Sequence, residues 1–263
     1  MSALVTGSMG FIGRHFWREL PRRGWSVDVN DIQAGPGAID FFSRSTTRYD
    51  LIVHAAARSP HRAAIDGEPA THIYNQHLDA AMFDWVVRTG TDVLYLSSCA
   101  VLDDELDAYG LLKLTGERMA EQARAAGINV TVVRPYSGYG EDQDERFPFG
   151  AFVARAKRRE DPFVIWGDGT QVRDWIHVSD VVAGALAVVA SGTTEPVSLC
   201  TGVGTSMREV AEMVCKAAGY EPEFELRPDK PAGVARRVGD PGLLRQFYEP
   251  TVSLAEGVER AFR

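Results

Sequence analysis

The chain has 263 residues, of which 45% are hydrophobic and 24% charged, and it carries a formal net charge of −8. This length and composition are typical of one globular domain with a smaller lobe. The acidic balance argues against a general nucleic-acid binder, because no surplus of Lys and Arg is present to neutralise phosphates. Cys99, Cys200 and Cys215 have neither pairing nor metal-ligand spacing, so we expect buried free thiols and no metal site.

No basic and apolar leader precedes the first predicted strand, which favours a cytoplasmic protein. The apolar stretch at 181–190 is too short to cross a bilayer and is predicted to be a buried helix. We therefore expect no membrane partner.

In the first half of the chain, short apolar runs alternate with amphipathic stretches. The runs predict strands at 3–6, 25–29, 51–57, 93–97 and 130–134, and the amphipathic stretches predict helices at 11–22, 75–89 and 109–126. Such alternation is typical of βαβ units, that is, of an α/β fold whose doubly wound parallel sheet has helices on both faces.

After residue 135 the pattern becomes irregular. We expect a loop at 136–150, followed by a helix at about 150–160 and a strand at 163–166. A strand end then leads to a helix at 180–190, with Ser179 as its cap. The last third is expected to form a helix at 206–220, a strand at 223–228 and a helix at 253–262. We assign residues 1–145 plus 172–192 to a dinucleotide-binding domain. Residues 146–171 plus 193–263 are assigned to a small carboxyl-terminal lobe.

The stretch "TGSMGFIG" at 6–13 places Gly7, Gly10 and Gly13 in the turn after the first predicted strand. Glycines there let the backbone approach a pyrophosphate, which the following helix N-terminus attracts. A tight structural turn without a ligand is the alternative. The next strand leads to Asp31, whose carboxylate suits the ribose hydroxyls of NAD and repels the 2′-phosphate of NADP, unless it is a simple turn residue.

Tyr109 and Lys113 lie four residues apart on a predicted helix and therefore share one face. A Lys ammonium beside a phenol favours the phenolate, and the same ammonium can reach the nicotinamide ribose. Ser98 follows a predicted strand, at the edge of the sheet where sites form in this architecture. Its hydroxyl can bind a substrate oxygen while Tyr109 transfers a proton, although Ser97 or Ser98 can instead simply cap the strand.

Together these residues resemble the extended short-chain dehydrogenase/reductases, in the branch of NAD-dependent nucleotide-sugar epimerases and dehydratases. The matching stretches are "TGSMGFIG" at 6–13, Asp31, "DLIVHAAA" at 50–57, "YLSSCAV" at 95–101, Tyr109 with Lys113, "RPYSGYG" at 134–140 and "GDGTQVRDWIHVSD" at 167–180. The resemblance implies a Rossmann-type domain, bound NAD and a small lobe that binds a nucleotide sugar.

The resemblance also implies roles for individual residues. The residues that would hold the pyrophosphate are Gly7, Gly10, Phe11, Ile12 and Gly13, and Asp31 would bind the adenosine ribose. Adenine would lie between Asp40 and Phe41, and the cofactor groove would be lined by Ala55, Ala56 and Ala57. Asn75 would lie near the active site, and the nicotinamide would lie beside Pro135 and Tyr136. Ser98, Ser137, Arg173 and Arg236 would contact the substrate. An ion pair with Asp168 or Asp174 is the alternative for Arg173.

Several positions depart from the family pattern. Leu102 and Ser137 stand where the family often has Tyr and Asn, and only the residues 99–108 separate Ser98 from Tyr109, so the loop over the sugar is short. Cys99 and Ala100 occupy the positions of the Asp-Glu pair that 4,6-dehydratases use for water loss, which argues against dehydration.

The leading functional interpretation is therefore a nucleotide-sugar 4-epimerase that oxidises C4 transiently, with Tyr109 as acid and base. An NDP-sugar 4-ketoreductase that uses the same residues, and a non-catalytic NAD-sensing protein, are the alternatives. The resemblance suggests a homodimer formed through helices 75–89 and 109–126, whose apolar stripes fit equally well against the sheet of one subunit.

Overall fold

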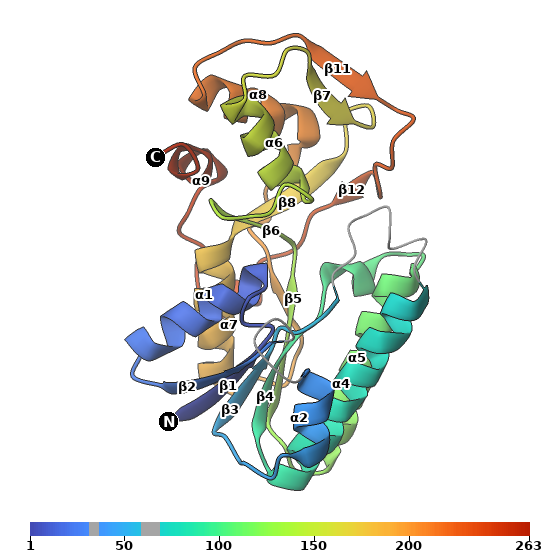
Figure 1. Cartoon of the computed structure of the whole chain (residues 1–263), viewed down its shortest axis with the longest axis vertical. Coiled ribbons are helices and arrows are strands. Elements are labelled where there is room, and N and C mark those ends of the chain that lie inside the picture. The colour runs from blue at the N-terminus through green and yellow to red at the C-terminus, as the bar shows by residue number, and fades with distance from the viewer. Residues whose placement is uncertain (32–36, 59–68) are drawn as a thin grey trace.

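The computed structural model describes residues 1–31, 37–58 and 69–263, and in them the central sheet is parallel with the order β2-β1-β3-β4-β5-β9 (Figure 1). Its strands are β1 (Ser2–Thr6), β2 (Ser26–Asn30), β3 (Leu51–His54), β4 (Asp92–Leu96), β5 (Val130–Pro135) and β9 (Val197–Leu199). The chain adds β2 on one side of β1 and β3 on the other. The strand order therefore reverses between β1 and β3, which is where such sheets bind ligands.

Helices cover both faces of this sheet, as the sequence predicts (Figure 1). α1 (Phe11–Arg22) and α7 (Val178–Ser191) pack on one face; α2 (Ala38–Arg44), α4 (Pro69–Thr89) and α5 (Ala108–Ala125) pack on the other. Side chains alternate along a strand, so Ala3 and Val5 join the first hydrophobic core and Leu4 joins the second. All three are at most 1% exposed, which explains why consecutive residues of β1 are apolar.

A smaller lobe lies beyond the carboxyl ends of the strands (Figure 1). It contains α6 (Pro148–Lys157), α8 (Met207–Ala217), α9 (Leu254–Arg260), the paired strands β7 (Phe163–Trp166) and β11 (Phe224–Arg227), and the strands β10 (Gly204–Ser206) and β12 (Arg236–Arg237). Strands β10 and β12 pair with β8 (Val172–His177), which also pairs with β6 (Ser137–Tyr139). Phe149, Phe163 and Val210 belong to its own core. Ser206 and Glu209 form a capping box at the start of α8.

Three local expectations differ from the structure. His177, not Ser179, caps α7, because the imidazole of His177 accepts the backbone N–H of Ser179. The predicted loop at 136–150 contains β6, which pairs with β8. Residues 197–199, which we assigned to the lobe, form β9 and pair with β5 in the central sheet. The rest of the proposed domain division stays a prediction.

Candidate active site

The turn between β1 and α1 is built so tightly that side chains would not fit. Gly7 has a φ of +67°, and a Cβ on it would lie 2.6 Å from the Ala55 carbonyl oxygen. A Cβ on Gly13 would lie 2.0 Å from the Gly7 carbonyl oxygen. Gly10 is the N-cap of α1 and supplies no side chain to the free N–H groups of the first turn. Such a helix N-terminus attracts an anion, so this turn fits a dinucleotide's pyrophosphate.

A cleft of about 130 Å³ opens beside this turn, at the point where the strand order reverses. Six residues that the sequence singles out line it: Gly7, Gly10, Asp31, Ala55, Ala56 and Ala57. Asp31 is 8% exposed and its carboxylate accepts the Met9 backbone N–H at 2.9 Å. The cleft also contains residues that the sequence did not indicate: Asn30, Ala38, Arg58, Tyr74 and Leu78.

The remaining cofactor candidates lie around this cleft in different ways. Asn75 holds the backbone of Arg58 at both its N–H and its carbonyl, each at 2.8 Å, and so shapes one wall. Asp40 and Phe41, the predicted neighbours of adenine, are not among the residues that line the cleft. Asp40 is exposed on α2, and the centre of the Phe41 ring lies 5.7 Å from that of Trp85. Ala38 of the same helix does line the cleft. Three further candidates lie nearby: Phe11 half-buried at the start of α1, Ile12 against the sheet core, and Pro135 at the end of β5.

Ser98, Tyr109 and Lys113 come from two elements that pack together at the end of β4. Ser98 follows β4 and caps the short helix η1 (Cys99–Leu102), accepting the Ala100 N–H at 3.2 Å. Tyr109 and Lys113 lie in the first turns of α5. Lys113 is 8% exposed, and its ammonium donates to the Leu96 carbonyl at 2.9 Å. The α5 helix approaches η1 so closely that a Cβ on Gly110 would lie 2.9 Å from the Ala100 carbonyl oxygen.

A buried ion pair anchors α5 one turn beyond Lys113. Glu117 binds the Arg134 guanidinium with both carboxylate oxygens, at 2.8 and 2.6 Å, and accepts the Ser97 hydroxyl at 2.6 Å. This contact joins α5 to β4 and β5 directly below the candidate catalytic residues. It also gives Ser97 a structural partner, whereas Ser98 stands at the sheet edge.

Cys99 follows Ser98 directly, Tyr136 lies near Cys99, and both are held in their neutral forms. Burial raises the pKa of the Cys99 thiol to about 11 and that of the Tyr136 phenol to about 12. A protonated thiol is a poor base at neutral pH, and Ala100 has no ionisable group. The two residues that follow Ser98 therefore supply no acid-base pair for the removal of water. Ser137, the next candidate, begins β6 half-buried.

A second cavity, of about 440 Å³, lies in the smaller lobe. Arg146, Arg155, Arg173 and Arg237 line it, together with the aromatic residues Phe147, Phe152 and Trp166. Arg173 is 8% exposed and donates to the carbonyls of Val172 and Ala232 at 2.8 and 3.3 Å. Arginines beside aromatic rings suit a ligand that combines a diphosphate with a flat base.

The two arginines of β12 lie on opposite sides of that strand. Arg236, which the sequence singled out, is exposed and is not among the residues that line the cavity. Its neighbour Arg237 lines the cavity and pairs with Asp103, in the segment between Ser98 and Tyr109. Residues that alternate along a strand face opposite ways, and the loose sequence pattern here gave no register that would distinguish them.

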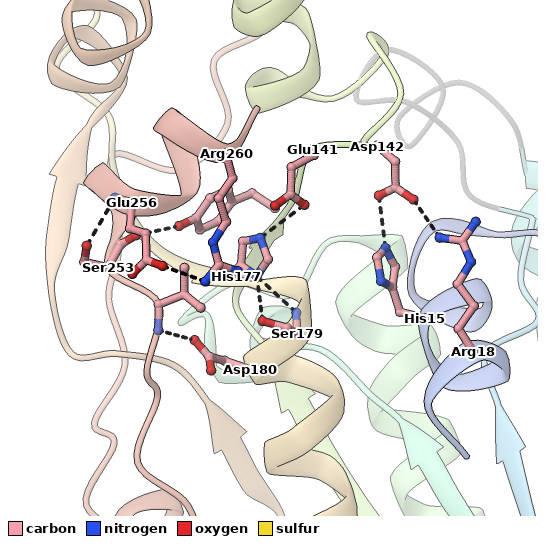
Figure 2. A network of polar contacts seen from close by, with 12 residues as sticks. His15, Arg18, Glu141, Asp142, His177, Ser179, Asp180, Ser253, Glu256 and Arg260 are labelled. Carbon is pink, nitrogen blue, oxygen red and sulfur yellow. Dashed lines mark hydrogen bonds and ion pairs between the residues drawn. The ribbon is translucent and has the colours of Figure 1, made fainter. Parts of the chain in front are cut away.

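A polar network connects α1, the segment after β6 and the start of α7, where Asp180 accepts the backbone N–H of Val252 at 2.9 Å (Figure 2). Asp142 binds His15 at 3.0 Å and Arg14 at 2.6 Å, both on α1. The adjacent Glu141 lies 3.4 Å from His177 at the start of α7. Burial opposes ionisation of Asp142, but hydrogen bonds from Arg14 and His15 hold the pKa of its carboxyl below the usual value. Burial lowers the pKa of His177, although Glu141 partly opposes that effect.

The parallel sheet and the glycine-lined cleft at its switch point define an α/β protein of the dinucleotide-binding class. The family model described as "NAD dependent epimerase/dehydratase family" matches residues 3–199, and the chain belongs to this family. This membership confirms the predicted class of NAD-dependent enzyme. In the part of the chain that the structure describes, no group of three His, Cys, Asp or Glu residues is arranged to hold a metal ion, and no helix is long and apolar enough to cross a membrane.

The chain is similar over its full length to enzymes with different activities. It is 28% identical to a dTDP-4-dehydro-6-deoxy-D-allose reductase of Streptomyces bikiniensis, over 100% of this chain and 95% of that one. It is 31% identical to an Arabidopsis thaliana GDP-mannose 3,5-epimerase, over 97% and 79%. A Streptomyces venezuelae dTDP-glucose 4,6-dehydratase solved with NAD has 26% identity and a TM-score of 0.88, with 99% of this chain and 95% of that one covered.

Proposed function

We propose that the protein is a nucleotide-sugar 4-epimerase that uses NAD. NAD, when bound, supplies the acceptance and return of a hydride. In the proposed reaction the Tyr109 phenolate takes the proton of the C4 hydroxyl, Ser98 holds the same oxygen, and Lys113 stabilises the phenolate. After the 4-keto sugar has turned in the pocket, Tyr109 returns the proton to the oxygen. Cys99, held as a thiol, takes no part.

The observation that carries this proposal is the position of Asp31. Its carboxylate lines the glycine-rich cleft, where it suits free ribose hydroxyls and repels the 2′-phosphate of NADP. An epimerase regenerates NAD within each turnover and needs no supply of reduced cofactor. A carboxylate that favours NAD is therefore consistent with a redox-neutral reaction.

We propose that the nucleotide part of the substrate occupies the cavity lined by Arg173 and Arg237. Four guanidinium groups line it and can donate to a diphosphate, although Arg146, Arg155 and Arg237 also pair with carboxylates. Phe147 and Trp166 offer flat surfaces to the base. We also propose a homodimer formed through α4 and α5, on which Ile73, Val87 and Leu111 are exposed.

A 4-ketoreductase is the second candidate, and the reductase relative that spans the whole chain favours it. The experiment that separates the two is a panel of UDP-, GDP-, dTDP- and CDP-sugars with the purified protein. Stoichiometric NAD retained after denaturation, together with a change of configuration at C4, supports the epimerase. NADH that exchanges freely and is consumed by a 4-keto sugar supports the reductase. Absence of turnover with every sugar, combined with NAD-dependent binding of a protein partner, would support an NAD sensor.

A further inference from the structure

A continuous chain of buried polar groups runs under the sheet edge from β1 to α4 and is not used by the proposed reaction. The Thr6 hydroxyl lies 2.9 Å from His54 Nδ1, and His54 Nε2 lies 3.2 Å from the Asp79 carboxylate. The Tyr95 hydroxyl donates to the other oxygen of Asp79 at 2.5 Å. These four residues are at most 3% exposed. An ionisable group buried this deeply needs a compensating partner.

The hydrogen bonds to Asp79 come from His54 and Tyr95. The Thr6 oxygen accepts the Ala56 N–H at 3.4 Å and lies within hydrogen-bond distance of His54 Nδ1. Thr6 thereby holds the His54 ring with its Nε2 toward Asp79. Burial alone would raise the pKa of Asp79, but the hydrogen bond from His54 and the charge of Lys113 hold it below the usual value. Asp79 is therefore ionised, and the positive charge of Lys113 helps to stabilise its carboxylate.

The Tyr95 side chain connects Asp79 with α5. The Lys113 ammonium lies 5.1 Å from the centre of the Tyr95 ring. The Tyr95 hydroxyl reaches the α5 backbone so closely that a Cβ on Gly116 would lie 1.9 Å from it. A cation over an aromatic face is attracted by the ring, and the carboxylate that binds the phenol strengthens the negative potential. Asp79 therefore acts on Lys113 across one phenol ring.

The Asp79 carboxylate of α4 supplies a negative charge near the buried Lys113 ammonium. From α5 and β5, Glu117 and Arg134 form an ion pair with each other. Tyr95 of β4 stays a phenol, because burial raises its pKa well above the usual value. Tyr109 of α5 and His54 of β3 also lie near Tyr95, and the Leu96 carbonyl that accepts from the ammonium is uncharged. Asp79 and Lys113 are therefore opposite charges that both contact the Tyr95 side chain.

We propose that Asp79 is the buried counter-charge of Lys113 and thereby a positioning residue for the Tyr109–Lys113 pair. The proposal rests on the proposed function, in which Lys113 supports Tyr109. In a site with little water the charge of Asp79 stabilises the ammonium form of Lys113 and keeps it on the Leu96 carbonyl, one helical turn from Tyr109.

A double-mutant cycle in urea tests the charge pairing without any assay of activity. Asp79→Asn and Lys113→Met each leave one buried charge uncompensated, so each variant should unfold at lower urea than the wild type. The double variant loses both charges and should unfold at higher urea than Asp79→Asn alone. If Asp79→Asn does not fold, a folded double variant gives the same support. A double variant that is no more stable than Asp79→Asn would overturn the proposal.

The pH dependence of the turnover rate tests the positioning role. Loss of the Asp79 charge disfavours the Lys113 ammonium and favours the Tyr109 phenolate, so both limbs of the profile of Asp79→Asn should move to lower pH by about one unit. Asp84→Asn is the matched control, because Asp84 lies on the same helix but is exposed and pairs with Arg88. A lower rate with unmoved limbs would overturn the positioning role. If no sugar is turned over by the wild type, the proposed function fails, whereas the urea cycle still decides on the ion pair.

Discussion

Asp103 and Arg237 form an ion pair between the short segment that separates Ser98 from Tyr109 and strand β12 of the lobe; their side chains are 19% and 20% exposed. Arg237 also lines the cavity proposed to hold the nucleotide. The segment beside the candidate catalytic residues is thus tied to a residue of the nucleotide cavity. The two parts of the site are therefore connected by a charged contact.

Arg237→Ala should raise the KM for the nucleotide sugar by about 10- to 100-fold, because a charge-assisted hydrogen bond contributes about 1.5–3 kcal/mol. The neighbouring Arg236→Ala, which removes the same charge from the exposed side of β12, should change the KM by less than about threefold. Steady-state kinetics with both variants checks this. A larger effect of Arg236→Ala would return the substrate role to the residue that the sequence singled out.

Asp31→Ala should lower the preference for NAD over NADP by about tenfold, since the variant lacks the carboxylate that repels a 2′-phosphate and binds the ribose hydroxyls. Fluorescence titration of the stripped protein with both dinucleotides measures the ratio. Asp28→Ala is a suitable control, because Asp28 lies on β2, the strand that leads to Asp31, and accepts the Tyr49 hydroxyl. A wild-type protein that already prefers NADP would show the cofactor assignment to be wrong.

Glu117→Ala should reduce the free energy of unfolding by about 3–5 kcal/mol, because it leaves the Arg134 guanidinium without its carboxylate in a largely buried site. Glu121→Ala on the same helix breaks an exposed pair with Arg118 and should cost less than about 1 kcal/mol. Urea denaturation of the two variants gives the comparison. Equal losses would mean that the buried pair does not anchor α5.

The fold was predictable from the sequence because its signals are local. Apolar runs of strand length and the amphipathic stretch at 11–22 predicted the β1, β4 and α1 elements to within about one residue. The cap of α7 was missed because Ser is a preferred N-cap residue and His is not. In the structure the His177 imidazole accepts the backbone N–H of Ser179 and takes this role. β9 was assigned to the lobe because its place beside β5 depends on a contact between distant parts of the chain.

The site was less predictable on the substrate side. The glycine turn and Asp31 follow fixed spacings, so their meeting in one cleft could be anticipated. The choice between Arg236 and Arg237 depends on the register of a two-residue strand. Asp79 of α4 carries no sequence signal, because its partners His54 and Tyr95 come from the strands β3 and β4. Such residues are found only once the chain has folded.

His177 should make the protein less stable as the pH falls. Burial lowers the pKa of His177 in the folded protein, so the unfolded chain binds the proton more readily. Stability should therefore decrease as the pH drops below about 6.5 and level off below the lowered folded pKa. Thermal unfolding of wild type and His177→Gln between pH 5 and 8 measures the difference. A slope that is unchanged in His177→Gln would assign the pH dependence to other groups.

In the proposed epimerase reaction a hydride leaves C4 of a nucleotide sugar and returns to it while Tyr109 moves the proton of the hydroxyl. Proton NMR of the purified NAD-loaded protein with its sugar substrate in D₂O follows the hydrogen at C4. The C4 epimer should form with its carbon-bound hydrogen retained, and Tyr109→Phe should keep its NAD but form epimer at least about 100-fold more slowly. Deuterium at C4, or near-normal epimerisation by Tyr109→Phe, would show that the proposed mechanism is wrong.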